Sequence, residues 1–136
     1  ILLHFDAVFI SPNTKIKYPF SELGLAPEVG SSYLLFQALG YQQAAQLLFQ
    51  SKAIDGTKYF ELGLAKYVGD DFLDQANSYA RELKEQSLSS IIETKAILKS
   101  FMLEEFAKAR SMETKAMKKV SGSEDNLKAV EKFFNK

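Results

Sequence analysis

Glu28 is the residue of this sequence whose surroundings best suit acid–base chemistry. It lies in the segment LAPEVG, residues 25–30, where apolar side chains flank the carboxylate and a glycine leaves room beside it. A carboxylate that faces an apolar pocket acquires a pKa suited to moving protons. Pro27 is also typical of a first helical position, which would place Glu28 in the first turn of a helix. There the helix dipole would stabilise the carboxylate by about 0.3 to 1 kcal/mol, and Glu28 would need no catalytic role. Catalytic and structural interpretations therefore both stay open.

Two other ionisable side chains favour structural roles. His4, the single histidine, ends an apolar segment and is predicted to be a core or interface residue without catalytic work. Asp6 follows at the junction with a strand and is predicted to be a turn or cap residue. One histidine and no cysteine give no basis for a zinc site or a thiolate nucleophile, so we expect no metal site.

Charge and hydropathy exclude two classes of partner. Lys plus Arg and Asp plus Glu number 17 each, which leaves no excess charge to attract nucleic acid. No apolar run approaches the roughly 20 residues that a membrane-spanning helix needs. We therefore expect no nucleic-acid partner and no membrane span.

Short strands and helices alternate in the first half of the chain. The patterns predict strands at residues 7–10, 15–18 and 65–68, a helical turn from Ser21 that ends at Gly24, a helix from Pro27 to Gly40, another at about 41–50, and a short helix capped by Asp55 that stops at Gly63. From Asp71 onward everything is predicted to be helical. A buried apolar stripe begins with Phe72 and Leu73, and Ser123 caps the last helix. Alternation with short links favours an α/β fold.

Three segments carry a resemblance to a known family: LLHFDAVFIS (2–11), YPFSELGLAPEVGSS (18–32) and the stretch from Ala38 to Val68. In order and spacing they resemble the second half of the crotonase (enoyl-CoA hydratase/isomerase) superfamily. The resemblance implies the C-terminal half of a crotonase-type ββα spiral at residues 1–85, followed by a helical C-terminal trimerisation region at residues 86–136. Because the chain opens with Ile1 inside an apolar segment, we expect it to be a C-terminal fragment.

The resemblance also bears on the reaction. Hydratases of the superfamily carry a glutamate directly after a proline where this chain has Phe20 after Pro19, so the hydratase acid is missing. Peroxisomal-type 3,2-trans-enoyl-CoA isomerases carry a glutamate in a Pro-Glu-Gly segment, which Glu28 matches although Val29 replaces the small residue. This implies isomerisation of 3-enoyl-CoA to 2-trans-enoyl-CoA in the β-oxidation of unsaturated fatty acids, with Glu28 shuttling the proton. The alternatives are a non-catalytic crotonase-like interaction module and a hydratase-type activity.

The implied substrate is an enoyl-CoA thioester, with no cofactor beyond the CoA of the substrate and with a homotrimer or hexamer as the assembly. The resemblance places the donors for the enolate oxygen upstream of Ile1, so the fragment alone is expected to be inactive. The sequence leaves the compartment open, as peroxisome or mitochondrion in a eukaryote or cytoplasm in a bacterium. The predicted substrate-binding residues are Phe20, Leu25, Tyr33, Leu34, Phe36, Lys132 and Phe133.

Several of these binding roles have a structural alternative. Helical periodicity makes Tyr33, Leu34 and Phe36 core residues first, and the resemblance implies that some of them line the acyl pocket. Lys132 resembles positions that reach the CoA of a neighbouring subunit, but it also suits a solvated basic helix face. Between Lys95 and Lys119 there are seven Lys or Arg and three Glu, an excess of four positive charges that fits either a solvated face or CoA phosphates.

Overall fold

Two pairs of short strands form the centre of the computed structural model, which describes residues 1–135; Lys136, the end of the predicted helical region, lies outside them. Strand β1 (Phe9–Ile10) pairs in parallel with β4 (Tyr67–Val68), and β2 (Lys15–Ile16) pairs antiparallel with β3 (Ile54–Asp55). The strands predicted near residues 7–10, 15–18 and 65–68 are confirmed, in shorter form. The first two pair with strands far along the chain and not with each other, and β3 was not predicted.

Helix α1 (Ser31–Gln50) confirms the predicted break at Gly40, where φ is 73° and ψ is 172°. Glycine tolerates this conformation because it has no Cβ. The predicted start at Pro27 is wrong. Val29 (φ 57°) and Gly30 (φ 75°) are both left-handed and cannot belong to a right-handed helix, so α1 begins at Ser31. Glu28 therefore lies in the loop before α1 and not in its first turn.

The shorter helical segments are η1 (Leu2–His4), η2 (Ser21–Leu23) and α2 (Gly56–Glu61). The last two confirm the predicted turn at Ser21 and the predicted helix after Asp55, whereas no cap signal predicts η1. Gly24 ends η2 with a φ of 63°. Asp55 caps α2, because its Oδ1 accepts a hydrogen bond from the backbone N–H of Lys58 at 2.8 Å.

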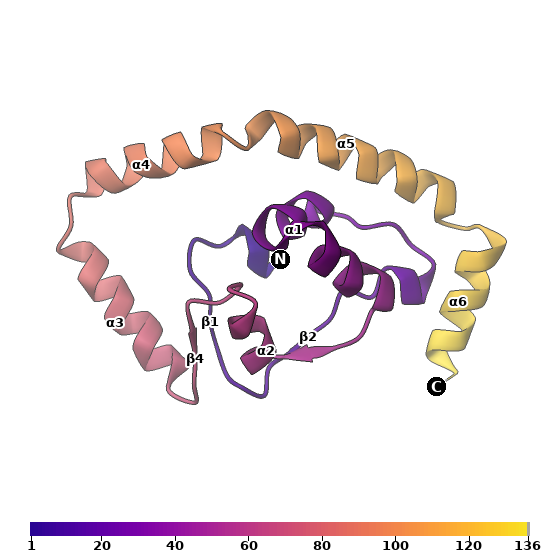
Figure 1. The fold of residues 1–136 in the computed structure, drawn as a ribbon, viewed down its shortest axis with the longest axis horizontal. Coiled ribbons are helices and arrows are strands. Elements are labelled where there is room, and N and C mark those ends of the chain that lie inside the picture. Colours follow the sequence, from indigo (N-terminus) through magenta and orange to yellow (C-terminus); the bar gives the residue numbers. More distant parts are fainter. Residues whose placement is uncertain (136) are drawn as a thin grey trace.

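Four helices follow one another around the outside of an inner part that consists of the strands and of helices α1 and α2 (Figure 1). They are α3 (Phe72–Lys84), α4 (Leu88–Ser100), α5 (Leu103–Val120) and α6 (Glu124–Phe134). Ser123 caps α6 as predicted, accepting from the N–H of Asn126 at 3.2 Å. An α/β fold with a helical C-terminal region is thus confirmed, while a division at residue 85 stays a prediction.

The core lies where α1 and α2 cover the strands. Its buried apolar residues are Val8, Ile10, Ile16, Tyr18, Leu35, Ala44 and Tyr59. The stripe predicted on the outer helices is only partly buried: Leu73 is 65% exposed and Leu98 is 60% exposed. These helices form an outer layer, and within this chain only their inner side has elements to pack against. None of the helices within residues 1–135 has the length and apolar character needed to cross a membrane.

Candidate functional site

Glu28 lies in the loop that joins η2 to α1, and its side chain is exposed. Its backbone carbonyl accepts hydrogen bonds from the N–H of Ser31 at 3.0 Å and from the Ser31 hydroxyl at 2.7 Å. These bonds attach the loop to the first turn of α1. The start of that helix therefore determines the path of the backbone at Glu28.

The backbone after Glu28 is held in an unusual conformation. Val29 is β-branched and has a φ of 57°, a conformation that costs about 1 to 3 kcal/mol and persists only where surrounding contacts impose it. His4 supplies one such contact by donating from Nε2 to the Val29 carbonyl at 2.9 Å. Phe106 of α5 supplies another: a Cβ built at Gly30 would lie 2.1 Å from its Cε2, so only glycine fits beneath the ring.

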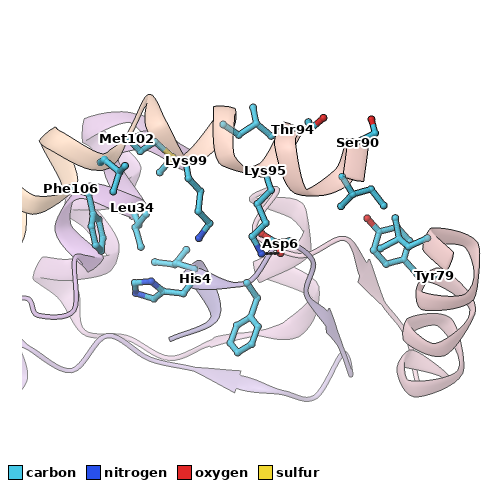
Figure 2. A pocket seen from close by; sticks show the side chains of 16 residues that line it. His4, Asp6, Leu34, Tyr79, Ser90, Thr94, Lys95, Lys99, Met102 and Phe106 are labelled. Atoms are coloured by element: carbon cyan, nitrogen blue, oxygen red, sulfur yellow. Dashed lines mark hydrogen bonds and ion pairs between the residues drawn. The ribbon is translucent and has the colours of Figure 1, made fainter. Parts of the chain in front are cut away.

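An apolar cavity of about 610 Å³ lies beside His4 and Phe106, while neither Glu28 nor the other residues of its loop line it. Residues of η1, α1, α3, α4 and α5 line it, and Figure 2 shows their side chains converging from the outer helices and from the N-terminal segment. His4 and Phe106 belong to the lining, with ring centroids 5.9 Å apart, and both also contact the loop after Glu28. The remaining lining residues are Leu3, Phe5, Asp6, Leu34, Tyr79, Leu83, Ser90, Ile91, Thr94, Lys95, Leu98, Lys99, Met102 and Leu103.

Two lysines of α4 line this cavity, and one of them is paired with a carboxylate of the same lining. Lys95 forms an ion pair with Asp6, and Lys99, one turn further along α4, extends toward the side of the cavity that holds His4 (Figure 2). An apolar cavity with the ammonium group of Lys99 on one wall suits a ligand that has both an apolar chain and an anionic part. Within residues 1–135, no three His, Asp or Glu side chains are grouped so that they could hold a metal ion.

The sequence pattern that defines the enoyl-CoA hydratase/isomerase family matches this chain over residues 1–136. The chain belongs to that family. The predicted crotonase resemblance is thereby confirmed. The strands with α1 and α2, and the outer helices α3 to α6 around them, are the C-terminal portion of the family fold.

Proteins of the family that resemble this chain are about twice as long. It is 28% identical to the putative enoyl-CoA hydratase/isomerase YhaR of Bacillus subtilis over 133 residues, which cover 96% of this chain and 52% of YhaR. It is 35% identical to the peroxisomal enoyl-CoA delta isomerase 3 of Mus musculus over 68 residues, which cover 50% of this chain and 22% of that protein. The structure of Pseudomonas aeruginosa OdaA superposes with a TM-score of 0.91 at 32% identity, covering 99% of this chain and 56% of OdaA.

Within this family fold, the predicted binding residues fall in different places. Leu34 lines the apolar cavity. Tyr33 lies next to that lining, with its ring centroid 6.3 Å from that of Phe106. Phe36 is exposed and Phe20 packs against the core. None of these last three residues lines the cavity, and their roles in binding stay predictions.

Leu25 and the two predicted residues of α6 lie apart from the cavity lining. Leu25 is half-buried next to η2 and donates its backbone N–H to the Phe20 carbonyl at 2.8 Å. Lys132 is exposed. The Phe133 ring centroid lies 5.7 Å from Nζ of Lys17. The structure of this chain does not bring these residues together with Leu34 or Glu28.

Sequence reasoning missed most of the cavity wall. Tyr79, Leu98, Met102 and Phe106 recur at helical spacing, and that spacing predicts a buried stripe without saying what it faces. Asp6 was predicted to be a turn or cap residue; it lies in a bend, and its ion pair with Lys95, 89 positions away, has no signal in the local sequence.

Proposed function

We propose that this chain supplies the acid/base carboxylate of an enzyme that converts 3-enoyl-CoA to 2-trans-enoyl-CoA, and that Glu28 is that carboxylate. The observation that carries the proposal is the placement of Glu28 in a loop of fixed shape. His4 and Phe106 both contact this loop and also line an apolar cavity of about 610 Å³. A general base must be held within hydrogen-bond reach of the proton that it removes.

One carboxylate is sufficient for the reaction. Glu28 takes a proton from C2 of the 3-enoyl thioester, and the electron pair of the broken C–H bond moves into the thioester carbonyl to give a dienolate. The same carboxyl then returns the proton to C4, the double bond moves from C3–C4 to C2–C3, and Glu28 is again ionised. No oxidant or cofactor enters this balance. The enolate oxygen needs hydrogen-bond donors, and such stabilisation is usually the largest catalytic contribution.

The surroundings of the loop support an acyl-CoA substrate. The cavity offers an apolar wall to an acyl chain, and Lys99 offers positive charge to the phosphates of CoA, whereas Lys95 is paired with Asp6. The mouse relative is an enoyl-CoA delta isomerase by name, which supports isomerisation over hydration. Phe20, in the place of the hydratase glutamate, also favours isomerisation.

The test compares wild type with Glu28→Gln in the full-length protein in which this sequence occurs. The substrate is 3-hexenoyl-CoA, and formation of the conjugated 2-hexenoyl-CoA is followed by its ultraviolet absorption. Loss of a general acid/base lowers rates by about 10² to 10⁴, so kcat of Glu28→Gln should fall at least 100-fold. Glu82→Gln, an exposed change on α3, is the control and should keep the wild-type rate. Equal rates for wild type and Glu28→Gln would remove the assignment.

A non-catalytic acyl-CoA-binding module is the second candidate, and the exposure of Glu28 in this chain favours it. The same experiment separates the two. Binding of 3-hexenoyl-CoA with no turnover by wild type would support the module. Formation of 3-hydroxyhexanoyl-CoA from 2-hexenoyl-CoA, supplied as a second substrate, would identify a hydratase.

The proposed assembly is a homotrimer or a hexamer. It is supported by large apolar side chains that α4 and the turn after it leave exposed, among them Leu88, Ile97 and Phe101. Apolar surface of this kind marks contact sites between proteins. Light scattering of the full-length protein should give a mass of three or six subunits, and a monomeric mass would remove this part of the proposal.

A further inference from the structure

Glu113 is a buried carboxylate to which the proposed reaction assigns no role. It lies in the middle of α5 and is only 7% exposed. Its Oε2 accepts from the backbone N–H of Gly30 at 2.7 Å. Its Oε1 accepts from the backbone N–H of Ser32 at 3.0 Å and from the Ser32 hydroxyl at 2.6 Å. One side chain of α5 thus binds three donors at the start of α1, more than 80 positions away in the sequence.

These bonds replace a cap that the local sequence cannot provide. The first N–H groups of a helix have no partner within the helix, and a side chain of the N-cap residue usually accepts from one of them. Gly30 is the N-cap of α1 and has no side chain. Glu113 takes its place, and the negative charge also suits the positive end of the helix dipole.

The same contacts act on the loop that carries Glu28. Gly30 is two residues from Glu28, and between them Val29 holds its left-handed conformation. Glu113 fixes the loop on the Gly30 side, and His4 fixes it at the Val29 carbonyl. Phe106 and Glu113 are both on α5, so the position of this helix relative to α1 determines the path of the backbone at Glu28.

We infer that Glu113 is a positioning residue for the Glu28 acid/base, acting through its hydrogen bonds to Gly30 and Ser32. The inference rests on the proposed function, because it concerns how Glu28 is aimed. Glu113 touches no reacting atom. Without the Glu113 carboxylate, the three donors of Gly30 and Ser32 are no longer all satisfied. The loop then relaxes, and the Glu28 carboxylate leaves the position from which it reaches both C2 and C4 of the substrate.

The test measures isomerase kinetics of Glu113→Gln in the full-length protein. Glutamine keeps the size of the side chain but offers only one acceptor oxygen to three donors. A misplacement of about 1 Å can lower a rate 100-fold, so kcat should fall between about 10-fold and about 100-fold. KM should change less than about threefold, because Glu113 does not contact the substrate. Glu104→Gln, an exposed change in the first turn of α5, is the matched control and should keep the wild-type kcat.

The double variant Glu28→Gln/Glu113→Gln separates positioning from general support of the fold. If Glu113 acts through Glu28, adding Glu113→Gln to Glu28→Gln should lower kcat no further, since residues that act as one unit are not additive. Two independent effects would multiply, and that result would overturn the inference. Ser32→Ala removes one of the three bonds and serves if Glu113→Gln does not fold. It should lower kcat a few-fold, again with no further loss when Glu28 is glutamine.

The outcomes distinguish failure of this inference from failure of the proposed function. If wild type is inactive, or Glu28→Gln is as active as wild type, the proposed function falls and this inference falls with it. If activity depends on Glu28 but Glu113→Gln and Ser32→Ala retain the wild-type kcat, the inference alone is overturned.

Discussion

Asn126 of α6 donates a hydrogen bond from Nδ2 to the backbone carbonyl of Leu23 in η2 at 2.6 Å. Asn126 is 6% exposed, and its Oδ1 accepts from the N–H of Gly122 at 2.8 Å. The two segments approach so closely that a Cβ at Gly24 would lie 2.8 Å from the Asn126 Cα. One polar side chain therefore attaches the last helix to the segment just before the Glu28 loop.

Asn126→Ala should detach α6 from η2. It removes the hydrogen bonds to the half-buried Leu23 carbonyl and to the exposed Gly122 N–H, each of which contributes about 0.5 to 1.5 kcal/mol. We expect a lower free energy of unfolding in urea and faster hydrogen exchange of the α6 amides. Leu127→Ala, the next position on the exposed side of α6, is the control and should change neither. Unchanged exchange in Asn126→Ala would show that the Leu23 contact does not hold the helix.

Gly56 gives a second prediction, because replacing this glycine with alanine should destabilise its helix instead of stabilising it. Alanine in place of glycine usually stabilises a helix by about 0.5 to 1 kcal/mol. At Gly56, the first residue of α2, a Cβ would lie 2.0 Å from the carbonyl oxygen of Ser11, while the Gly56 N–H donates to Pro12 at 3.0 Å. Gly56→Ala should therefore lower the free energy of unfolding by about 1 to 3 kcal/mol. Thr57→Ala, at the exposed neighbouring position, should be neutral or slightly stabilising; a stabilising Gly56→Ala would contradict the close contact with Ser11.

The parts of the fold that the sequence could predict depend on chemistry acting within about four residues. Asp55 and Ser123 cap their helices with side-chain oxygens that accept from the N–H three positions ahead. Gly24 ends η2, and Gly40 breaks α1, each with a positive φ that its missing side chain permits. These features need no partner from elsewhere in the chain.

The parts that could not be predicted depend on partners far along the chain. Nothing near Val29 predicts a positive φ, because β-branched residues disfavour it; the conformation is imposed by His4, Phe106 and Glu113. A helix beginning at Pro27 was the natural local prediction, and these contacts exclude it. Glu28 was identified from residue types and from a family resemblance, whereas the residues that hold its loop become visible only when α5 lies against α1.

Burial of the Tyr18 and Tyr59 side chains predicts loss of stability at alkaline pH. Tyr18 is 9% exposed and Tyr59 is fully buried. Burial raises the pKa of both phenols above the ordinary value of 10.0, and for Tyr18 the nearby Tyr59 raises it further. In the unfolded chain both phenols ionise near pH 10, whereas in the folded protein they keep their protons to higher pH. The unfolded state therefore releases protons first, and the free energy of unfolding should fall as the pH rises above about 10, by up to about 1.4 kcal/mol per pH unit for each tyrosine.

Urea unfolding of the full-length protein between pH 7 and pH 11 checks this prediction. The quantity compared is the slope of the free energy of unfolding against pH, not the free energy itself. Tyr18→Phe and Tyr59→Phe should each flatten the decline above pH 10, because phenylalanine has no proton to lose. Tyr41→Phe, at an exposed position of α1, should leave the decline as steep as in wild type. The same slope in all three variants would mean that alkaline unfolding is driven by groups other than the two buried phenols.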